Sequence, residues 1–193
     1  MNKYLRGING IIVGALKTII LRMERGAKVS IVFPAFISSG TEVSVDKGGE
    51  LSVGRRISMR HGSRLTVRDK ARLIIGNNFY MNTGCIISAH ESIIIGDNVE
   101  FGSGVFVYDQ DHDFRADGGL AAKKFKTSAV TIGNNVWIGA NTIILRGTVI
   151  GDNCVVGAGS VLKGCFPSNS LIVQKRETEV LQINNYRNTD ICK

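Results

Sequence analysis

Residues 132–162 read IGNNVW IGANTI ILRGTV IGDNCV VGAGSV L, and they set the class of fold. An aliphatic residue recurs at strict six-residue spacing, and a small or β-branched residue follows four positions after each of the first five. An α-helix needs apolar residues at steps of about 3.6 and a half-buried strand needs them at steps of two, so this period indicates neither. It predicts a parallel β-helix, in which each hexapeptide is one short strand and a corner, and about 18 residues close a triangular coil. The inward aliphatic positions are Ile132, Ile138, Ile144, Ile150, Val156 and Leu162, and the small inward positions are Val136, Thr142, Thr148, Cys154 and Ser160.

The composition favours one folded domain. The chain has 193 residues, of which 44% are hydrophobic and two are proline, and this excludes a disordered class. Its 23 glycines suit a coil that turns a corner every six residues, because corners use left-handed or crowded backbone positions. The net charge of +8 favours an anionic partner. The basic residues are scattered and no basic motif is interleaved with aromatic residues, so no nucleic acid partner is expected.

The four cysteines do not predict a disulfide framework or a metal site. No pair has CxxC spacing. Cys85 and Cys154 each follow an inward ladder position by four residues, where the repeat takes a small residue, so both are predicted to pack in the core. Nothing in this pattern implies an oxidising compartment.

Residues 3–23 carry a helical pattern. On a wheel of about 100° per residue the apolar side chains fall within roughly 140° of arc, opposite a basic and polar side. The segment is too short and too charged for a transmembrane span, and no small-residue cleavage motif follows it, so neither a spanning helix nor a secretory signal is expected. The helix either packs on the solenoid or a partner subunit, or lies on an anionic inner-membrane surface. The apolar set is Tyr4, Leu5, Ile8, Ile11, Ile12, Ala15, Leu16, Ile19 and Met23, and the polar set is Lys3, Arg6, Asn9 and Lys17.

The chain divides into three predicted parts: an amphipathic helix in 1–26, a β-helix in 27–175, and a tail in 176–193. A coil-opening signature of an aliphatic residue, a glycine and two polar or turn residues occurs five times, which implies at least five coils. Residues 29–51 are expected to form an irregular first coil. The signature begins at Val53, Ile75, Ile95, Ile132 and Ile150.

The period fails between Val107 and Val130 and then resumes in phase. Such an insertion predicts a single loop, at about 108–129, extruded from one corner of the solenoid, where solenoids carry function. His112 lies in this loop, and its neighbours Asp109, Asp111 and Asp113 are expected to orient the imidazole as a general base.

The positions of the other two histidines and the lack of a nucleophile motif limit the reactions that the sequence can support. His61 and His90 fall at different offsets in their coils, so they are not expected to stack with each other or with His112. No nucleophile motif is evident, and a histidine base without a nucleophile suits direct attack by a hydroxyl of the acceptor on an activated acyl group. Asparagine amides or backbone N–H groups at the coil corners are candidates for stabilising the oxyanion.

Four features together resemble the hexapeptide-repeat acyltransferases: the ladder, the loop with His112-Asp113, the run from Ile132 to Ala140 containing Trp137, and the Gly-Ala-Gly-Ser-Val run from Gly157. The branch that O-acetylates sugars and polysaccharides from acetyl-CoA is the most similar. The resemblance implies a single-stranded left-handed β-helix, since handedness does not follow from the repeat itself. It also implies a homotrimer with active sites between subunits, without a metal.

The resemblance assigns roles to residues. His112 is implied as the general base, and Asn82, in the run from Phe79, as a residue that holds the acceptor sugar, with Tyr108, Asp111 and Asp113 of the loop beside it. Trp137 is implied to lie beside the cofactor. The pantetheine groove is implied to use small residues with exposed backbone N–H groups, and basic residues are candidates for the CoA phosphates. These cofactor residues are Gly139, Ala140, Ala158, Gly159, Lys163, Lys175 and Arg176.

The resulting hypothesis is a cytoplasmic, acetyl-CoA-dependent O-acetyltransferase that acts on a sugar hydroxyl of a surface or capsular polysaccharide or its precursor. Two departures from the family pattern favour a polysaccharide over a small sugar. Residues 87–89 are Ile-Ser-Ala where many sugar acetyltransferases are acidic, and residues 173–177 replace the common Gly-Asn-Pro-Ala-Lys ending.

Three alternatives remain open at the level of sequence. One is a small-molecule acetyltransferase of the same fold, acting on a sugar, an amino sugar or serine. Another is a metal-dependent hydratase like the γ-type carbonic anhydrases, which needs three histidines on one zinc. The third is a non-catalytic scaffold that binds a membrane or a partner through residues 3–23.

Overall fold

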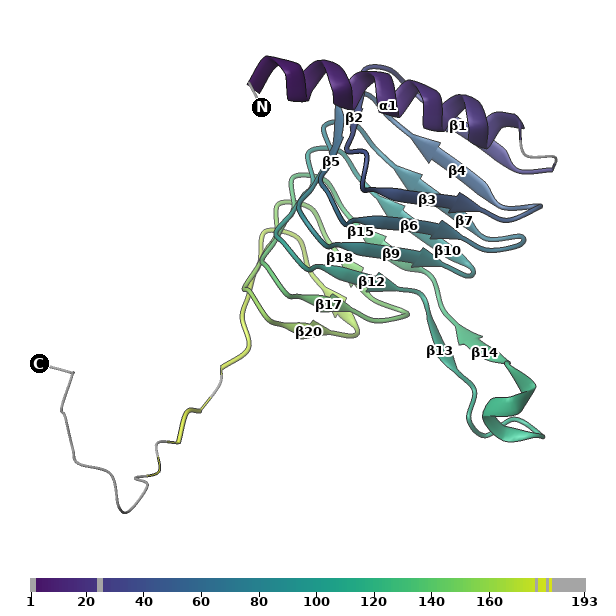
Figure 1. Cartoon of the computed structure of the whole chain (residues 1–193). Coiled ribbons are helices and arrows are strands. Elements are labelled where there is room, and N and C mark those ends of the chain that lie inside the picture. Colours follow the sequence, from purple (N-terminus) through teal and green to yellow (C-terminus); the bar gives the residue numbers. More distant parts are fainter. Residues whose placement is uncertain (1–2, 24–25, 176, 180, 182–193) are drawn as a thin grey trace, which may run out of the picture.

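The computed structural model describes residues 3–23, 26–175, 177–179 and 181. A helix, α1 (Lys3–Met23), lies across the N-terminal end of a stack of short strands, and a hairpin projects from one side of the stack (Figure 1). Most of the predicted tail at 176–193 lies outside the described residues.

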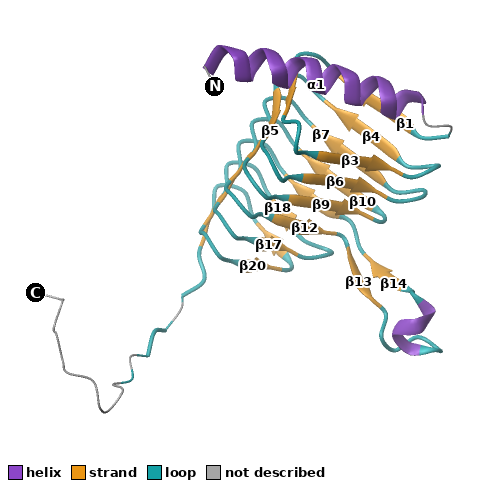
Figure 2. Cartoon of the chain, in the orientation of Figure 1, coloured by secondary structure: helices purple, strands orange, loops and turns teal. Residues whose placement is uncertain are grey.

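The strands form three parallel sheets that make the sides of a triangular coil (Figure 2). The first sheet contains β1 (Lys28–Ile31), β4 (Glu50–Val53), β7 (Arg72–Ile75), β10 (Ser92–Ile95), β15 (Val130–Ile132), β18 (Val149–Ile150) and β21 (Cys165–Phe166). The second contains β2 (Ala35–Ile37), β5 (Ile57–Met59), β8 (Tyr80–Met81), β11 (Glu100–Phe101), β16 (Trp137–Ile138), β19 (Val155–Val156) and β22 (Leu171–Ile172). The third contains β3 (Glu42–Val45), β6 (Arg64–Val67), β9 (Ile86–Ala89), β12 (Phe106–Tyr108), β17 (Ile143–Ile144) and β20 (Val161–Leu162).

Each coil takes one strand from each sheet in turn, so the described chain makes six complete coils and two strands of a seventh. The prediction of a left-handed parallel β-helix with an N-terminal helix and one extruded loop is confirmed. We call the corner between the first and second sheets the first corner, that between the second and third sheets the second corner, and that leading to the next coil the third corner.

The six-residue ladder forms the core, as predicted. All six aliphatic positions from Ile132 to Leu162 and all five small positions between them are buried. Cys85 and Cys154 are buried as well, and burial raises the pKa of the Cys85 thiol. Register follows from the same spacing, because Ile95 pairs with Ile132 and Ile132 pairs with Ile150 in successive coils.

Asparagine and aspartate side chains hold the first corner together. The side-chain oxygen of each of Asn77, Asp97, Asn134 and Asp152 accepts a backbone N–H bond from the coil before it. A second column of asparagines, in the left-handed backbone conformation, bonds side chain to side chain from coil to coil. This column consists of Asn78, Asn98, Asn135, Asn153 and Asn169. The expectation that corner asparagines are available to an oxyanion is therefore wrong at this corner.

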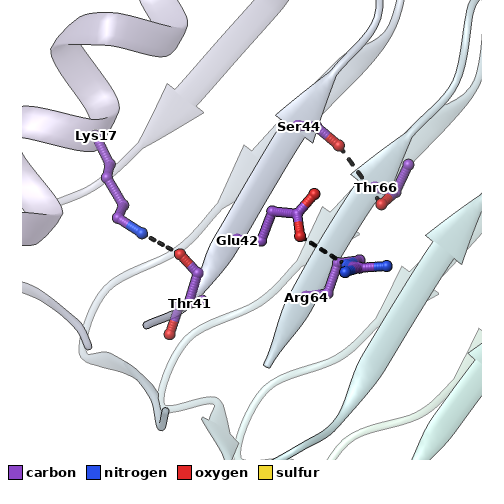
Figure 3. A network of polar contacts seen from close by, with 6 residues as sticks. All are labelled: Lys17, Thr41, Glu42, Ser44, Arg64 and Thr66. Carbon is purple, nitrogen blue, oxygen red and sulfur yellow. Dashed lines mark hydrogen bonds and ion pairs between the residues drawn. The ribbon is translucent and has the colours of Figure 1, made fainter. Parts of the chain in front are cut away.

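Helix α1 packs on the solenoid through its small residues. Gly14 and Thr18 are buried, and a Cβ atom on Gly14 would lie 2.6 Å from the carbonyl oxygen of Ala35. Lys17, whose pKa burial lowers, donates to the carbonyl oxygens of Ser39 and Thr41 (Figure 3). The close approach requires glycine, so the centre of the apolar arc points away from the coils. No described helix has both the length and the apolar character needed to cross a bilayer.

Candidate active site

The predicted loop is an ordered hairpin at the third corner. Its strands β13 (Gln110–His112) and β14 (Phe125–Thr127) pair antiparallel, and a short helix, η1 (Gly119–Ala122), lies between them. The hairpin projects outward from the coils (Figure 1). It interrupts the step from β12 to β15 without disturbing their alignment with neighbouring coils.

Asp109 anchors the base of the hairpin to the solenoid. Its side chain is fully buried, and the carboxylate accepts hydrogen bonds of 2.8 Å from each of the backbone N–H groups of His90, Glu91 and Ser92. Its own carbonyl oxygen accepts a bond from the N–H of Ser128, where the hairpin returns. One buried carboxylate therefore ties the preceding coil to both ends of the insertion, and it is satisfied by backbone donors.

His112 is exposed on β13, and its imidazole packs on Phe125 with ring centroids 4.7 Å apart. The expected orientation of this ring by three aspartates is wrong. Asp109 binds backbone N–H groups, Asp111 pairs with Arg146 at 2.6 Å, and Asp113 pairs with Lys126 at 3.1 Å. The hydrogen bond from Lys126 lowers the pKa of the exposed Asp113 carboxyl. An aromatic contact, and not a carboxylate, positions the predicted base.

The hairpin also brings a second histidine to the site. The ring centroid of His90 lies 4.7 Å from that of Phe125, so Phe125 touches both His90 and His112. Burial lowers the pKa of His90, and the charges of Arg68 and His112 act in the same direction, against the opposing charges of Asp109 and Asp46. As expected, no ring contact joins His90 to His112 directly among the described residues, but both rings share Phe125 of the hairpin as a partner.

Gln110 contributes a polar atom whose hydrogen-bonding capacity is unused. Its side-chain carbonyl oxygen is buried and has no donor among the described residues. Buried acceptors are nearly always satisfied, and leaving one unpaired costs about 1–3 kcal/mol. Gln110 lies on the same strand as His112.

The predicted cofactor residues gather at a different corner. Gly139 and Ala140 lie at the second corner of one coil, with Ala158 and Gly159 directly after β19 in the next. The N–H groups of Gly139 and Gly159 donate to the carbonyl oxygens of Val156 and Ala140, so they are used within the solenoid. Glycine is needed at position 139 because a Cβ atom would lie 2.5 Å from the Ala158 nitrogen.

Within the part of the chain that the structure describes, Ala140 and Ala158 differ from these glycines, since no acceptor is found for either backbone N–H. Asn82 occupies the same corner two coils earlier, and its side-chain oxygen accepts the N–H of Thr83. Trp137 is 56% exposed on β16, two residues before Gly139. Backbone N–H groups without an acceptor, beside an exposed indole ring, suit an extended pantetheine amide chain.

One chain does not bring all predicted site residues together. His112, Asp111, Asp113 and the half-buried Tyr108 lie at the third corner, together with Lys163, which directly follows β20. The residues of the second corner are separated from them by the length of a third-sheet side, roughly 15–20 Å at about 3.3 Å per residue. Lys175 is exposed beyond β22, and Arg176 lies outside the described residues.

Three site residues had recognisable signals in the sequence that the prediction missed. Asp109 follows the inward Val107 by two residues, so alternation places its carboxylate inside. Arg146 is a charged residue two positions after the inward Ile144, and Phe125 is an aromatic residue in a largely polar and charged insertion. The proximity of His90 had no sequence signal, because it depends on how the hairpin folds back.

Metal ligation finds no support in the described geometry. Among the described residues, no group of three or more histidine, cysteine, aspartate or glutamate side chains is arranged to hold a metal ion. His61 lies at the second corner, apart from the other two histidines.

The comparisons with known proteins agree with the fold and the repeat. Residues 129–164 match the family described as "Bacterial transferase hexapeptide (six repeats)". The chain is 34% identical over 108 residues to WbbJ of Escherichia coli K12, provisionally named as a lipopolysaccharide biosynthesis O-acetyl transferase, covering 52% of this chain and 55% of that protein. It is 38% identical over 99 residues to the galactoside O-acetyltransferase of the same organism, covering 49% and 46%.

A solved N-acyltransferase, AntD of Bacillus cereus in complex with dTDP-4-amino-4,6-dideoxyglucose and coenzyme A, superposes with a TM-score of 0.66 over 83% of both chains at 24% identity. The likeness at that identity is one of fold. The chain spans about half the length of the curated relatives it matches. The repeat, the solenoid and these matches make the chain similar to the hexapeptide-repeat transferases, with the family match confined to residues 129–164.

Proposed function

We propose that this protein is an acetyl-CoA-dependent O-acetyltransferase that acetylates a sugar hydroxyl of a surface polysaccharide or its precursor. The observation that carries the proposal is the ordered hairpin, which presents an exposed imidazole on an aromatic support beside a buried, unpaired acceptor. The relatives named above act, by their names, on lipopolysaccharide and on galactosides, which supports a glycan acceptor.

The residues fit a direct transfer. Acetyl-CoA supplies an activated acetyl group and CoA as leaving group. His112 accepts the proton of the acceptor hydroxyl while its oxygen bonds to the carbonyl carbon, and then returns the proton to the departing sulfur as the carbon–sulfur bond breaks. The free N–H groups of Ala140 and Ala158 are placed to bind amide or carbonyl oxygens of the cofactor.

The two-corner arrangement favours a homotrimer, in which the hairpin of one copy meets the second corner of the next. The third sheet, which joins the two corners, carries an apolar column on its outer face. Its members pair in register from coil to coil, and the first three are partly exposed whereas the last is exposed: Ile86, Phe106, Ile143 and Val161. An outward apolar stripe beside an incomplete site is best explained as a subunit interface.

The test is the His112→Ala variant, with His61→Ala as its matched control. Acetyl transfer from labelled acetyl-CoA to a panel of bacterial glycans should fall by roughly 100-fold or more in the first variant, because general base catalysis contributes about that much. His61 lies at the second corner of an early coil, so its variant should retain the rate. Undiminished transfer by a folded His112→Ala protein would reject the assignment. A wild-type protein with no thermal stabilisation by CoA would favour the scaffold alternative.

A further inference from the structure

The outer face of α1 is an exposed apolar surface. Five aliphatic side chains of this helix are each 53–60% exposed, and together they line the side opposite the buried Gly14 and Thr18. We call this set the outer helix face: Ile8, Ile12, Leu16, Ile19 and Ile20. Because α1 lies across the end of the stack (Figure 1) with Gly14 and Thr18 buried against the first coil, the opposite side of the helix faces away from the coils. Contiguous exposed apolar patches of this kind mark an interaction surface.

The helix is fixed in this orientation. The ammonium group of Lys17 is held by two carbonyl oxygens of the first coil, as Figure 3 shows for Thr41. The hydroxyl of Thr18 bonds back to the carbonyl oxygen of Gly14, and Gly10 also lies close to β2. Rotating the helix to bury its aliphatic side would break these contacts and push branched side chains against the backbone of β2.

The same end of the molecule carries the net positive charge. Residues 1–72 contain 14 of the 24 lysines and arginines but only five of the 16 aspartates and glutamates, so their net charge is +9 and that of the remaining 121 residues is −1. The second coil and the start of the third are the densest part, with seven exposed basic side chains distributed around their corners and strands. We call these the basic collar: Arg55, Arg56, Arg60, Arg64, Arg68, Lys70 and Arg72.

Most of the collar is free to bind anions. Arg64 and Arg68 pair with the exposed Glu42 and Asp46, and Arg72 donates to Ser92 (Figure 3 shows the first pair). The side chains of Arg55, Arg56, Arg60 and Lys70 have no carboxylate partner in the described chain. Coils are spaced by about 4.8 Å, so the collar lies within reach of a surface that the helix touches.

We propose that the outer helix face and the basic collar dock the enzyme on an anionic phospholipid bilayer. The helix inserts its aliphatic side chains at the headgroup boundary while the collar faces the phosphates, the arrangement of an interfacial amphipathic helix. Lipid is favoured over a second copy because the exposed halves of five aliphatic side chains fall well below the roughly 800 Å² per partner of a stable interface, and because two +9 ends repel.

Docking goes beyond the proposed acetyl transfer and does not depend on it. If both proposals hold, the solenoid axis stands on the membrane and the hairpin lies at a fixed height above it. Acceptors carried on a lipid anchor would then encounter His112 more often, whereas the encounter rate of free sugars would not change.

The experiment is co-sedimentation of the full chain with vesicles of phosphatidylcholine alone or with an equal part of phosphatidylglycerol. Wild type should bind the anionic vesicles and lose most binding in high salt. Ile12→Asp/Leu16→Asp should weaken binding roughly 100-fold, since each buried aliphatic side chain contributes more than tenfold. Arg56→Gln/Arg60→Gln should weaken it roughly 10- to 30-fold, at about fivefold per basic residue. The matched control Lys123→Gln/Lys124→Gln removes two exposed charges from the hairpin and should bind like wild type.

Two outcomes would overturn docking. One is equal sedimentation of wild type and Ile12→Asp/Leu16→Asp, with both proteins folded by circular dichroism. The other is a change of oligomeric mass in that variant, measured by light scattering, without vesicle binding by wild type, which would assign the face to a second copy. Acetyl transfer to a soluble acceptor should be unchanged in the variant, so loss of docking and failure of the proposed activity are distinguishable.

Discussion

The first and third corners of the solenoid use the same polar residue types in opposite ways. At the first corner, the side-chain oxygens of Asn134 and Asp152 accept hydrogen bonds from backbone N–H groups of the preceding coil, and this pattern repeats along the stack. At the third corner, Asp111 and Asp113 pair with basic side chains of their own neighbourhood and leave His112 with only an aromatic contact. Polar side chains at the first corner bond one coil to the next. Asp111 and Asp113 at the third corner bond to basic side chains and leave the imidazole of His112 without a carboxylate partner.

Removing Asp109 should have the largest effect on this contrast. Asp109→Ala leaves three backbone N–H groups, one of them on the buried Ser92, without their acceptor, which should cost about 3 kcal/mol in unfolding free energy. Urea denaturation measures this loss. Asp109→Asn keeps one side-chain oxygen and should lose less. Acetyl transfer should fall in both variants, because the hairpin loses its base. A stable and fully active Asp109→Ala protein would show that the hairpin is held by other contacts.

Breaking the column of asparagines at the first corner should lower the stability of the protein and leave its acetyl transfer rate unchanged. Asn135 sits at φ 55° and bonds to Asn98 and Asn153 in the neighbouring coils. Asn135→Ala loses both bonds and keeps a strained backbone, at a cost of about 1–2 kcal/mol. Asn135→Gly relieves the strain, so it should be the less damaging change. Thermal melts and transfer rates measured on both variants decide the point, and a reduced rate in either would mean that this corner also serves the site.

The sequence predicts the structure of the repeat much better than that of the hairpin at the third corner. The spacing from Ile132 to Leu162 determines strand length, register and burial together, because each inward residue meets its equivalent in the next coil. Handedness did not follow from spacing. In the hairpin the order of residues does not say which aspartate meets which cation, since Asp111 finds Arg146 across 35 positions.

The helix illustrates the same limit. Its amphipathic angle was predictable, but the choice of buried side was not, because the close approach of Gly14 to Ala35 outweighs burial of the aliphatic side chains. A helical wheel ranks faces by hydropathy and does not register how near a glycine face can come to a neighbouring backbone.

A smaller effect is expected from the pair that joins the hairpin to the next coil. Arg146 and Asp111 are 25% and 47% exposed, so their ion pair is worth at most about 1 kcal/mol. Arg146→Gln should therefore lower acetyl transfer no more than about fivefold and barely change stability. The Asp111→Asn change in the same protein should add nothing if the two act only as a pair. Additive losses in this double-mutant cycle would instead point to a direct contact of Asp111 with the acceptor.

The smallest expected effect is a pH dependence that reports how the hairpin covers His90. Burial keeps the pKa of this imidazole below its ordinary value in the folded protein, so the unfolded chain takes up the proton first. Stability should therefore be lost as pH falls from about 6.5, the ordinary value, towards the lower folded value. Urea midpoints at pH 7.5 and 5.5 measure the loss, and His90→Gln, which cannot titrate, should show a smaller drop. An identical drop in both proteins would assign the pH dependence to other groups and leave His90 open to solvent beneath the hairpin.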